Sequence, residues 1–415
     1  MARPTSRRSF IKTSAATAFA MTAASYGRIV GANDRLRIGL IGCGERGRNA
    51  HMPGIHAHVQ AMNFEVVAVS DPWRIAREQA AAKALEWYGK EPRQFVSHND
   101  LLAIDDLDAV MVASADHQHT RQLIDIAAAK KDVYIEKPLS MDFEELKRAV
   151  DAVKAAGIVV QIGTQLRSFP TFTGCREVYR SGLLGKVSRI EQCRNAAQPY
   201  WYGYLKHDVK PEDVDWKEFE GNRPHKPFSP VRFSGWYGYR DYSDGPLCGL
   251  GSHFIDLVHY ITGATFPTSC VCMGGTYTWK DENNFDCPDH VEAVWEYPEG
   301  FLVHYSTNFG NGSGNTFKIF GDVGVMDMVN WHKPILTADG GSRNKGAIRG
   351  QNEVQEVPRP DHFLDWLQCV RSRGTPNASI DAGYQHAVAC LMGVRAMDTG
   401  KRMIYDQARR EIREG

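Results

Sequence analysis

The feature that most constrains this chain is an apolar segment, residues 38–41, that runs directly into Gly42-x-Gly44-x-x-Gly47. Gly42 permits a tight turn, Gly44 lets the backbone approach a pyrophosphate, and Gly47 allows the next helix to pack closely against the strand. The phosphates would lie at the positively polarised N-terminus of that helix. The segment therefore predicts a strand, a turn and a helix that bind a dinucleotide. The other turn residues expected beside this cofactor are Cys43, Glu45 and Arg46.

A second apolar segment, Phe64–Ser70, ends at Asp71, where a carboxylate is placed to accept hydrogen bonds from the adenosine ribose hydroxyls. A 2′-phosphate would face a like charge there, so Asp71 favours NAD over NADP. Arg74 is near enough in the sequence to weaken this exclusion, and NADP stays open. Asp71-Pro72 could also cap a helix, because proline suits the first helical turn. The two roles are compatible.

The N-terminus has a different pattern, Ser6-Arg7-Arg8-Ser9-Phe10, followed by a mildly apolar stretch rich in Ala and Thr over residues 13–25. This pattern resembles a bacterial Tat export signal. The stretch is too short and too polar to span a bilayer stably. We expect a Tat signal over residues 1–33, a passing interaction with the Tat translocase, and a periplasmic or otherwise exported protein. An ordinary basic tail is the alternative.

Export bears on the cofactor, because free NAD should be scarce outside the cytoplasm. An exported enzyme must keep its nicotinamide tightly bound and regenerate it in place, or pass its electrons elsewhere. The composition fits such a protein: 415 residues, 43% of them hydrophobic, and a formal net charge of zero predict about two domains and no nucleic-acid partner. The nine cysteines are scattered without zinc spacing, so we expect buried thiols and no metal.

Strand and helix patterns alternate from Arg37 to about Thr164, which predicts a doubly wound parallel sheet. Polar residues follow its later strands, residues 107–113, 132–135 and 159–162. Ligands of open parallel sheets bind at the carboxyl ends of the strands. The residues assigned to the cofactor at these ends are Ser114, Asp116, His117, His119, Glu136, Lys137 and Gln165.

The pattern changes after about residue 185. Period-two alternation in separated runs predicts a largely antiparallel, open-faced sheet. The expected strands are residues 187–193, 269–278, 291–296, 302–308 and 317–320, with one helix among them at 251–263 and two closing helices at 361–371 and 382–399. We expect a nucleotide domain over 34–160, an α/β substrate and oligomerisation domain over 161–375, and a C-terminal helix and tail over 376–415. An open sheet face needs a cover, so a homodimer or homotetramer is expected.

Three ordered motifs now carry a resemblance: the glycine turn, Glu136-Lys137-Pro138, and Leu250-Gly-Ser-His253-Phe-Ile-Asp256. Together they resemble the Gfo/Idh/MocA family of glucose-fructose oxidoreductase and inositol dehydrogenase type, over about residues 35–401. The resemblance implies that Lys137 lies beside the nicotinamide and orients the hydroxyl that loses hydride. It implies that His253 takes the hydroxyl proton, a task that suits imidazole because its pKa lies near neutrality.

Each of these roles has a plainer alternative. Lys137 could be a solvated surface lysine, and His253 a capping or packing histidine. His253-x-x-Asp256-x-x-His259 could suggest a metal, but residues six apart diverge around a helix. Asp256 lies one turn after His253 and is able to share its face.

The chain departs from the family pattern at Gly249. Many dehydrogenases of the family have an aspartate four residues before the histidine, where it would join the lysine and the histidine around the reacting hydroxyl. Asp244 and Asp256 are the acidic residues nearby that could replace it. We place Asp256 with Lys137 and His253 as the expected catalytic residues.

Aromatic residues gather in two stretches, 200–204 and 236–242, that should border the cleft. Flat rings with polar tips suit the C–H faces of a sugar, and nearby arginines and Gln165 suit its hydroxyls. The alternative is that these rings pack a loop or a subunit contact. The residues assigned to substrate are Arg167, Arg232, Trp236, Tyr237 and His253.

Four functions compete on these observations. The first is an exported NAD(P)-dependent oxidoreductase of a sugar, polyol or glycoside hydroxyl. The second is a redox-neutral NAD-dependent glycosidase that oxidises C3, eliminates the glycosidic bond, adds water and returns the hydride. The third is a noncatalytic sugar-binding protein, and the fourth is an ordinary hydrolase with paired carboxylates. We rank them in this order.

Overall fold

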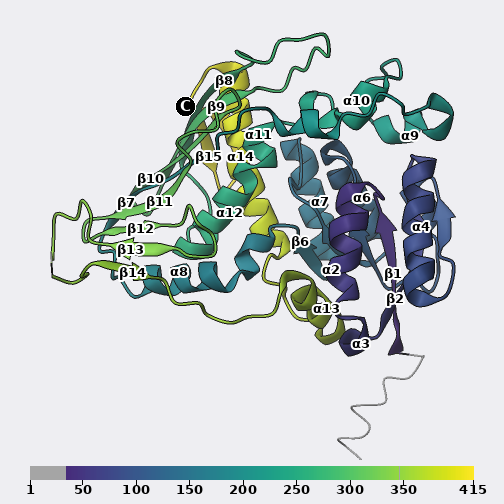
Figure 1. The fold of residues 1–415 in the computed structure, drawn as a ribbon, viewed down its shortest axis with the longest axis horizontal. Coiled ribbons are helices and arrows are strands. Elements are labelled where there is room, and N and C mark those ends of the chain that lie inside the picture. Colours follow the sequence, from purple (N-terminus) through teal and green to yellow (C-terminus); the bar gives the residue numbers. More distant parts are fainter. Residues whose placement is uncertain (1–33, 345) are drawn as a thin grey trace, which may run out of the picture.

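The computed structural model describes residues 34–344 and 346–415, so the expected signal at residues 1–33 lies outside the described part. The described residues form two sheets, shown side by side in Figure 1. One is six-stranded and parallel, and the other is ten-stranded and mostly antiparallel. The predicted fold class, a doubly wound parallel sheet joined to an α/β domain with a large antiparallel sheet, is confirmed.

The parallel sheet has the strand order β3-β2-β1-β4-β5-β6, and all its neighbouring pairs are parallel. Its central strands are buried on both faces, which explains their continuous apolar sequence. The strands are β1 Leu36–Ile41, β2 Phe64–Ser70, β3 Arg93–Phe95, β4 Ala109–Val112, β5 Asp132–Ile135 and β6 Val160–Ile162. The helices are η2 Gly47–His51, α2 Met52–His56, α3 Val59–Met62, α4 Arg74–Tyr88, α5 His98–Leu102, α6 His119–Ala128 and α7 Phe143–Ala156, with a 3₁₀ turn, η3, at Asp116–Gln118.

The first domain extends beyond the predicted boundary at residue 160. That boundary falls inside β6, which pairs with β5 through Ile162. The late helix α13, His362–Ser372, also packs on this domain, because Trp366 and Leu367 are fully buried in the same apolar cluster as Leu40 of β1. A segment of the predicted second domain thus completes the core of the first.

The second sheet has the order β14-β13-β12-β11-β7-β10-β9-β8-β15-β16. Its neighbours pair antiparallel except β10 and β7, which pair parallel. The strands are β7 Val187–Cys193, β8 Ser269–Gly275, β9 His290–Tyr297, β10 Phe301–Asn308, β11 Thr316–Gly321, β12 Val325–Asp327, β13 Ile335–Thr337, β14 Gln351–Glu353, β15 Met403–Asp406 and β16 Glu411–Glu414.

One face of this sheet is covered and the other is open. Helices α8 (Pro170–Arg180), α12 (Gly251–Thr262) and α14 (Ile380–Thr399) contribute side chains to the apolar core that includes the inner face of the sheet. Figure 1 shows α12 and α14 between the two sheets. On the open face Val271, Met273 and Leu302 are exposed by 48%, 77% and 46%. The sheet thus keeps an apolar strip on its outer surface.

The prediction of one helix between the strands of this domain was incomplete. Several single-turn helices also occur there: η4 Gln165–Ser168, η5 Tyr200–Tyr204, η6 Pro211–Asp213, α9 Trp216–Glu220, α10 Pro230–Ser234, η7 Trp236–Gly238 and α11 Pro246–Gly249. They are too short to show helical periodicity, and an aromatic cluster that includes buried Trp201, Tyr242 and Phe309 joins several of them.

All nine cysteines fall within the described residues as free thiols, and seven are buried. This agrees with their prediction as small core residues. No helix in the described ranges is long and apolar enough to cross a membrane.

Candidate active site

The glycine turn has the geometry that its spacing predicts. Gly42 has φ +86°, and a Cβ there would come within 2.4 Å of the Ser114 main-chain nitrogen. A Cβ on Gly47 would come within 2.1 Å of the Gly42 carbonyl, whereas Gly44 has nothing within 4 Å of that position. The first and third glycines are therefore required by the fold. The second leaves the backbone open to a ligand.

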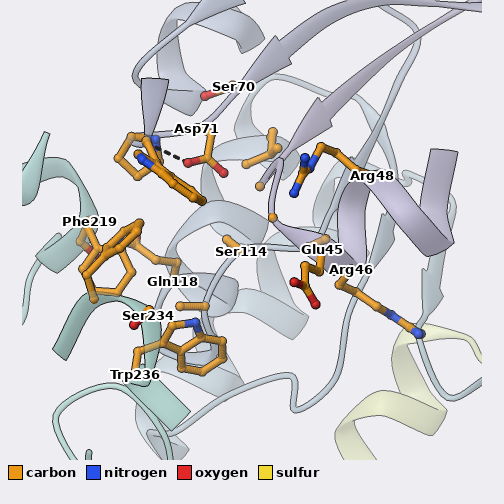
Figure 2. Close-up of a pocket in the computed structure, with 18 of the residues that line it drawn as sticks. Glu45, Arg46, Arg48, Ser70, Asp71, Ser114, Gln118, Phe219, Ser234 and Trp236 are labelled. Atoms are coloured by element: carbon orange, nitrogen blue, oxygen red, sulfur yellow. Dashed lines mark hydrogen bonds between the residues drawn. The ribbon is translucent and has the colours of Figure 1, made fainter. Parts of the chain in front are cut away.

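The turn borders a cavity of about 430 Å³ between the two domains. Figure 2 shows Asp71 and Arg48 at one end of it and Ser234 and Trp236 at the other. The predicted residues that line it are Gly42, Gly44, Glu45, Arg46, Asp71, Ser114, Trp236 and Tyr237. Lining residues that the sequence analysis missed include Arg48, Trp73, Gln118, Lys206, Phe219 and Ser234. Arg48 and Trp73 adjoin the predicted motifs, and Gln118 lies between the predicted His117 and His119. Lys206, Phe219 and Ser234 come from helices and loops with no signal of their own.

Asp71 joins the glycine turn to the end of β2. Its carboxylate accepts hydrogen bonds from the main-chain nitrogens of Cys43 at 2.6 Å and Trp73 at 2.7 Å. The alternative role as a helix cap is wrong, because α4 begins at Arg74 with Trp73 at its N-cap. Burial raises the pKa of Asp71 to about 6. The Arg74 guanidinium, which was expected to weaken NADP exclusion, instead pairs with Glu78 and Asp213.

Replacing Asp71 with serine is expected to weaken NAD binding about 10- to 100-fold, the cost of losing hydrogen bonds to a charged acceptor. NADP binding should fall less, because the same change removes a negative charge beside the 2′-phosphate. Titrating nucleotide into both proteins by fluorescence measures the ratio of the two dissociation constants. An unchanged ratio of the NAD and NADP dissociation constants would show that Asp71 only holds the glycine turn and does not select the cofactor.

Glu136 is buried and contacts the glycine turn through Arg46. Its carboxylate accepts hydrogen bonds from Arg46 Nε at 2.6 Å and from His51 Nε2 at 2.9 Å. Burial alone would raise the pKa of Glu136, but Arg46 and His51 outweigh it and hold this pKa well below its usual range. Gly163 is needed here, since a Cβ would lie 2.8 Å from the carboxyl group. Glu136 therefore holds Arg46 of the glycine turn and His51 of η2 in place.

Lys137 and His253 both lie at the junction of α11 and α12. Lys137 Nζ donates a 2.6 Å hydrogen bond to the carbonyl oxygen of Gly249, the last residue of α11. Burial lowers the pKa of Lys137, with Glu136 and Asp116 opposing the shift. Burial, and then the charge of Lys137, lower the pKa of His253 well below its usual value. His253 is thus neutral near pH 7, and its buried Nδ1 has no hydrogen-bond partner among the described residues.

Asp256 and Arg167 do not reach this junction. Asp256 is fully buried and accepts a 2.6 Å hydrogen bond from Arg167 Nε, and its other oxygen lies 3.3 Å from Nδ1 of His386. Helix α14, which carries His386, covers the face of α12 on which Asp256 lies. The predictions of Asp256 as a catalytic residue and Arg167 as a substrate ligand were therefore wrong. The two side chains form a buried ion pair with each other.

The polar residues after β4, which are Asp116, His117 and His119, also have partners within the protein. Asp116 is buried, accepts a 3.0 Å hydrogen bond from Ser243 Oγ, and has its pKa raised by burial to about 7. His117 Nε2 lies 2.7 Å from the Phe219 carbonyl oxygen, and burial lowers the pKa of His117 to about 3. His119 Nδ1 similarly lies 2.7 Å from the Pro138 carbonyl oxygen. The two predicted cofactor histidines instead hold main-chain segments in place.

The remaining assigned residues, Gln165, Arg232 and Cys43, differ in burial and in their contacts. Gln165 is partly exposed, and its Oε1 has no partner among the described residues. Arg232 is paired with Asp241 at 3.1 Å and stacks 4.1 Å from the ring centre of Tyr239, and its assignment to substrate stays a prediction. Cys43 is fully buried and contributes only its main chain to the turn. Within the described ranges, no group of three or more His, Cys, Asp or Glu is placed to hold a metal ion.

This arrangement provides a nucleotide-sized cavity, an unshielded main-chain turn for phosphates, and a carboxylate placed for ribose hydroxyls. It also provides a cation, Lys137, and a neutral proton acceptor, His253, at one helix junction. The residues therefore fit a dinucleotide at the turn and a proton-coupled reaction beside it.

Comparison with known proteins agrees with this geometry. Residues 36–164 match the family model described as "Oxidoreductase family, NAD-binding Rossmann fold", and residues 214–327 match the "GFO/IDH/MocA C-terminal domain". The chain is 31% identical to myo-inositol 2-dehydrogenase of Thermotoga maritima over 367 residues, which cover 87% of this chain and 95% of that protein.

Solved structures show the same fold at lower identity. The WlbA dehydrogenase of Bordetella pertussis, in complex with NADH and UDP-GlcNAcA, has a TM-score of 0.66 at 21% identity, covering 90% of this chain and 99% of that one. Levoglucosan dehydrogenase in complex with NADH has a TM-score of 0.67 at 18% identity, covering 89% and 98%. With its NAD-binding Rossmann domain and its C-terminal domain both matched, this chain belongs to the Gfo/Idh/MocA family of oxidoreductases.

Proposed function

We propose that this protein oxidises a CH–OH group of a sugar, polyol or glycoside with NAD. The observation that carries the proposal is the convergence of Lys137 and His253 on the α11–α12 junction, with Lys137 Nζ 2.6 Å from the Gly249 carbonyl oxygen. Bound NAD⁺ supplies the hydride acceptor. The substrate carbon loses a hydride and its hydroxyl loses a proton to His253, so the products are a ketone or lactone, NADH and one proton.

The substrate class is supported by aromatic side chains around the cavity. Trp236, Tyr237 and Tyr204 line it, and the rings of Tyr204 and Tyr237 lie 5.3 Å apart. Rings of this kind pack against the C–H faces of a sugar. The names of relatives point the same way, since myo-inositol and levoglucosan are a polyol and an anhydrosugar.

The direct test uses protein purified without added nucleotide. Its absorbance and mass show whether nicotinamide stays bound, and a panel of myo-inositol, levoglucosan, free aldoses and aryl glycosides is then added while NADH absorbance is followed. We expect NADH to form with a free sugar, a polyol or levoglucosan. Release of an aglycone without net NADH would instead identify the redox-neutral glycosidase, and binding without either signal would identify a binding protein.

We also propose that the protein is exported with its cofactor in place. The support is the Arg7-Arg8 pair and the stretch after it, which precede a domain that binds a dinucleotide. The Tat route suits proteins that fold and load a cofactor before they cross.

Replacing Arg7 and Arg8 by lysines is expected to retain the protein in the cytoplasm of a Tat-competent bacterium, because the translocase reads the arginine pair itself. Fractionation followed by immunoblotting measures the periplasmic share. A single substitution, Lys12→Arg, is the matched control and should leave export unchanged. Normal export of the double lysine variant would reject the Tat interpretation.

The open sheet face supports a homo-oligomer. Val271 and Met273 of β8 and Leu302 of β10 form an exposed apolar patch on two strands of this sheet, with β9 between them. An apolar patch of this kind marks a protein–protein contact. We propose that a second copy of the chain covers it, and a solution mass equal to one chain would contradict this.

A further inference from the structure

The space beside Gly249 is occupied by a hydroxyl group from another element. A Cβ placed on Gly249 would lie 2.5 Å from the hydroxyl oxygen of Tyr200 and 3.5 Å from its Cζ. The carbonyl oxygen of the same glycine accepts the hydrogen bond from Lys137 Nζ. Tyr200 and Lys137 therefore converge on one residue, four positions before His253 in the chain.

The Tyr200 hydroxyl is shielded from solvent and has no hydrogen-bond partner among the described residues. A buried polar group without a partner is unfavourable, and such groups in native structures call for an explanation. The ring is only partly buried, and it stands edge-on to Tyr237, 5.3 Å away, which lines the nucleotide cavity. The Tyr200 ring thus contacts a residue that lines the cavity, and its hydroxyl group is unpaired beside Gly249.

The acidic residues nearest in sequence are already committed to other partners. Asp244 is 4% exposed and lies 3.5 Å from Arg240, and Asp256 is paired with Arg167. Neither carboxylate is free to replace a side chain missing at residue 249. The charge of Asp116 acts on Lys137, but Ser243 already donates a hydrogen bond to this carboxylate.

We propose that Tyr200 is a catalytic residue whose hydroxyl hydrogen-bonds the substrate hydroxyl that loses hydride, in the space that a side chain on residue 249 would otherwise fill. This inference rests on the proposed function. Burial and the nearby Asp116 raise the pKa of Tyr200 well above its usual value, so the phenol stays protonated and can donate as well as accept. The substrate hydroxyl is then held by Tyr200 and Lys137 while His253 takes its proton.

The position of the Tyr200 ring is set by its neighbours. Its ring contacts Trp201 at 5.3 Å, Tyr237 at 5.3 Å and Phe309 at 5.9 Å, all edge-on. Phenylalanine keeps all three contacts and removes only the hydroxyl. Tyr200→Phe should therefore fold and bind NADH like the wild type while its kcat falls about 10- to 100-fold, the loss expected for one hydrogen bond at the reacting group.

A second pair of variants tests the geometry without turnover. Gly249→Ala should lower the melting temperature, because its Cβ meets the Tyr200 hydroxyl at 2.5 Å. In the Tyr200→Phe background the same change should cost little, since the nearest ring atom then lies at an ordinary contact distance. Gly249→Asp combined with Tyr200→Phe should recover part of the lost kcat, because a carboxylate then occupies the place of the hydroxyl.

The decisive measurement is kcat and KM of wild type, Tyr200→Phe and the Gly249→Asp, Tyr200→Phe pair on the compound that reduces wild-type cofactor. A reduced kcat with unchanged NADH affinity and partial rescue supports the proposal. A wild-type kcat in Tyr200→Phe would overturn the catalytic role of Tyr200 and leave the proposed function intact. Failure of the wild type to form NADH with every compound would overturn the proposed function and, with it, this role.

Discussion

Replacing Lys137 with methionine is expected to lower kcat/KM about 100- to 1,000-fold, as the loss of one positioned donor at a reaction centre does. Methionine keeps the length of the side chain but loses the cation and its hydrogen bond to the Gly249 carbonyl oxygen. NADH affinity should stay near wild type, because the cavity at the glycine turn is not lined by Lys137. Steady-state kinetics together with NADH titration measure both quantities.

The chain offers a matched control for this change. Lys131 also donates a 2.6 Å hydrogen bond to a main-chain carbonyl, that of Leu107, in the same domain but away from the glycine turn. Lys131→Met should therefore reproduce any general cost of losing such a bond and leave kcat/KM unchanged. Equal kinetic losses in the two variants would show that Lys137 acts through folding, and full activity of Lys137→Met would remove it from the mechanism.

Replacing His253 with alanine is expected to lower kcat about 100- to 10,000-fold, the usual contribution of a positioned general base. His253→Asn should be equally impaired, since an amide is polar but does not take up a proton near neutral pH. Because burial and Lys137 lower the pKa of His253, the imidazole stays neutral as pH falls toward the ordinary histidine value of about 6.5. Activity that depends on His253 should therefore be lost only at lower pH, where the ring becomes protonated.

His259 of the same helix is the control for this second change. It is buried, and its Nε2 lies 2.8 Å from the hydroxyl of Tyr297. His259→Ala should lower the free energy of unfolding by about 1–3 kcal/mol and leave kcat of the folded protein intact. His253→Ala should show the reverse. If both variants lost stability and neither lost kcat, His253 would be a packing residue.

The parts of the fold and site that could be predicted from sequence depend on short-range rules. The roles of Gly42 and Gly47 follow from main-chain distances inside one turn, and the structure shows both contacts. Strands of six to eight residues in the second sheet were found because alternation needs several residues to be visible. The three-residue strands β12, β13 and β14 offer too few positions for that pattern.

Side-chain direction was the part that could not be predicted. Asp256 follows His253 by one helical turn, yet its side chain is covered by α14. It forms a buried ion pair with Arg167 instead of facing the reaction centre. His117 and His119 follow a strand end, as cofactor ligands do, but main-chain carbonyls lie within hydrogen-bond distance of both. The place of Tyr200 beside Gly249 depends on how η5 packs on α11, which neither local sequence encodes.

The packing of α13 on the first domain determines when this domain can complete its folding during synthesis. Trp366 and Leu367 complete the core around β1, and the Ile162 nitrogen at the edge strand β6 donates to the Ala378 carbonyl oxygen at 2.8 Å. A ribosome must therefore release most of the chain before the nucleotide domain has its full core. Capture of the dinucleotide by a complete first domain then follows the synthesis of α13 instead of accompanying the synthesis of β1 to β6.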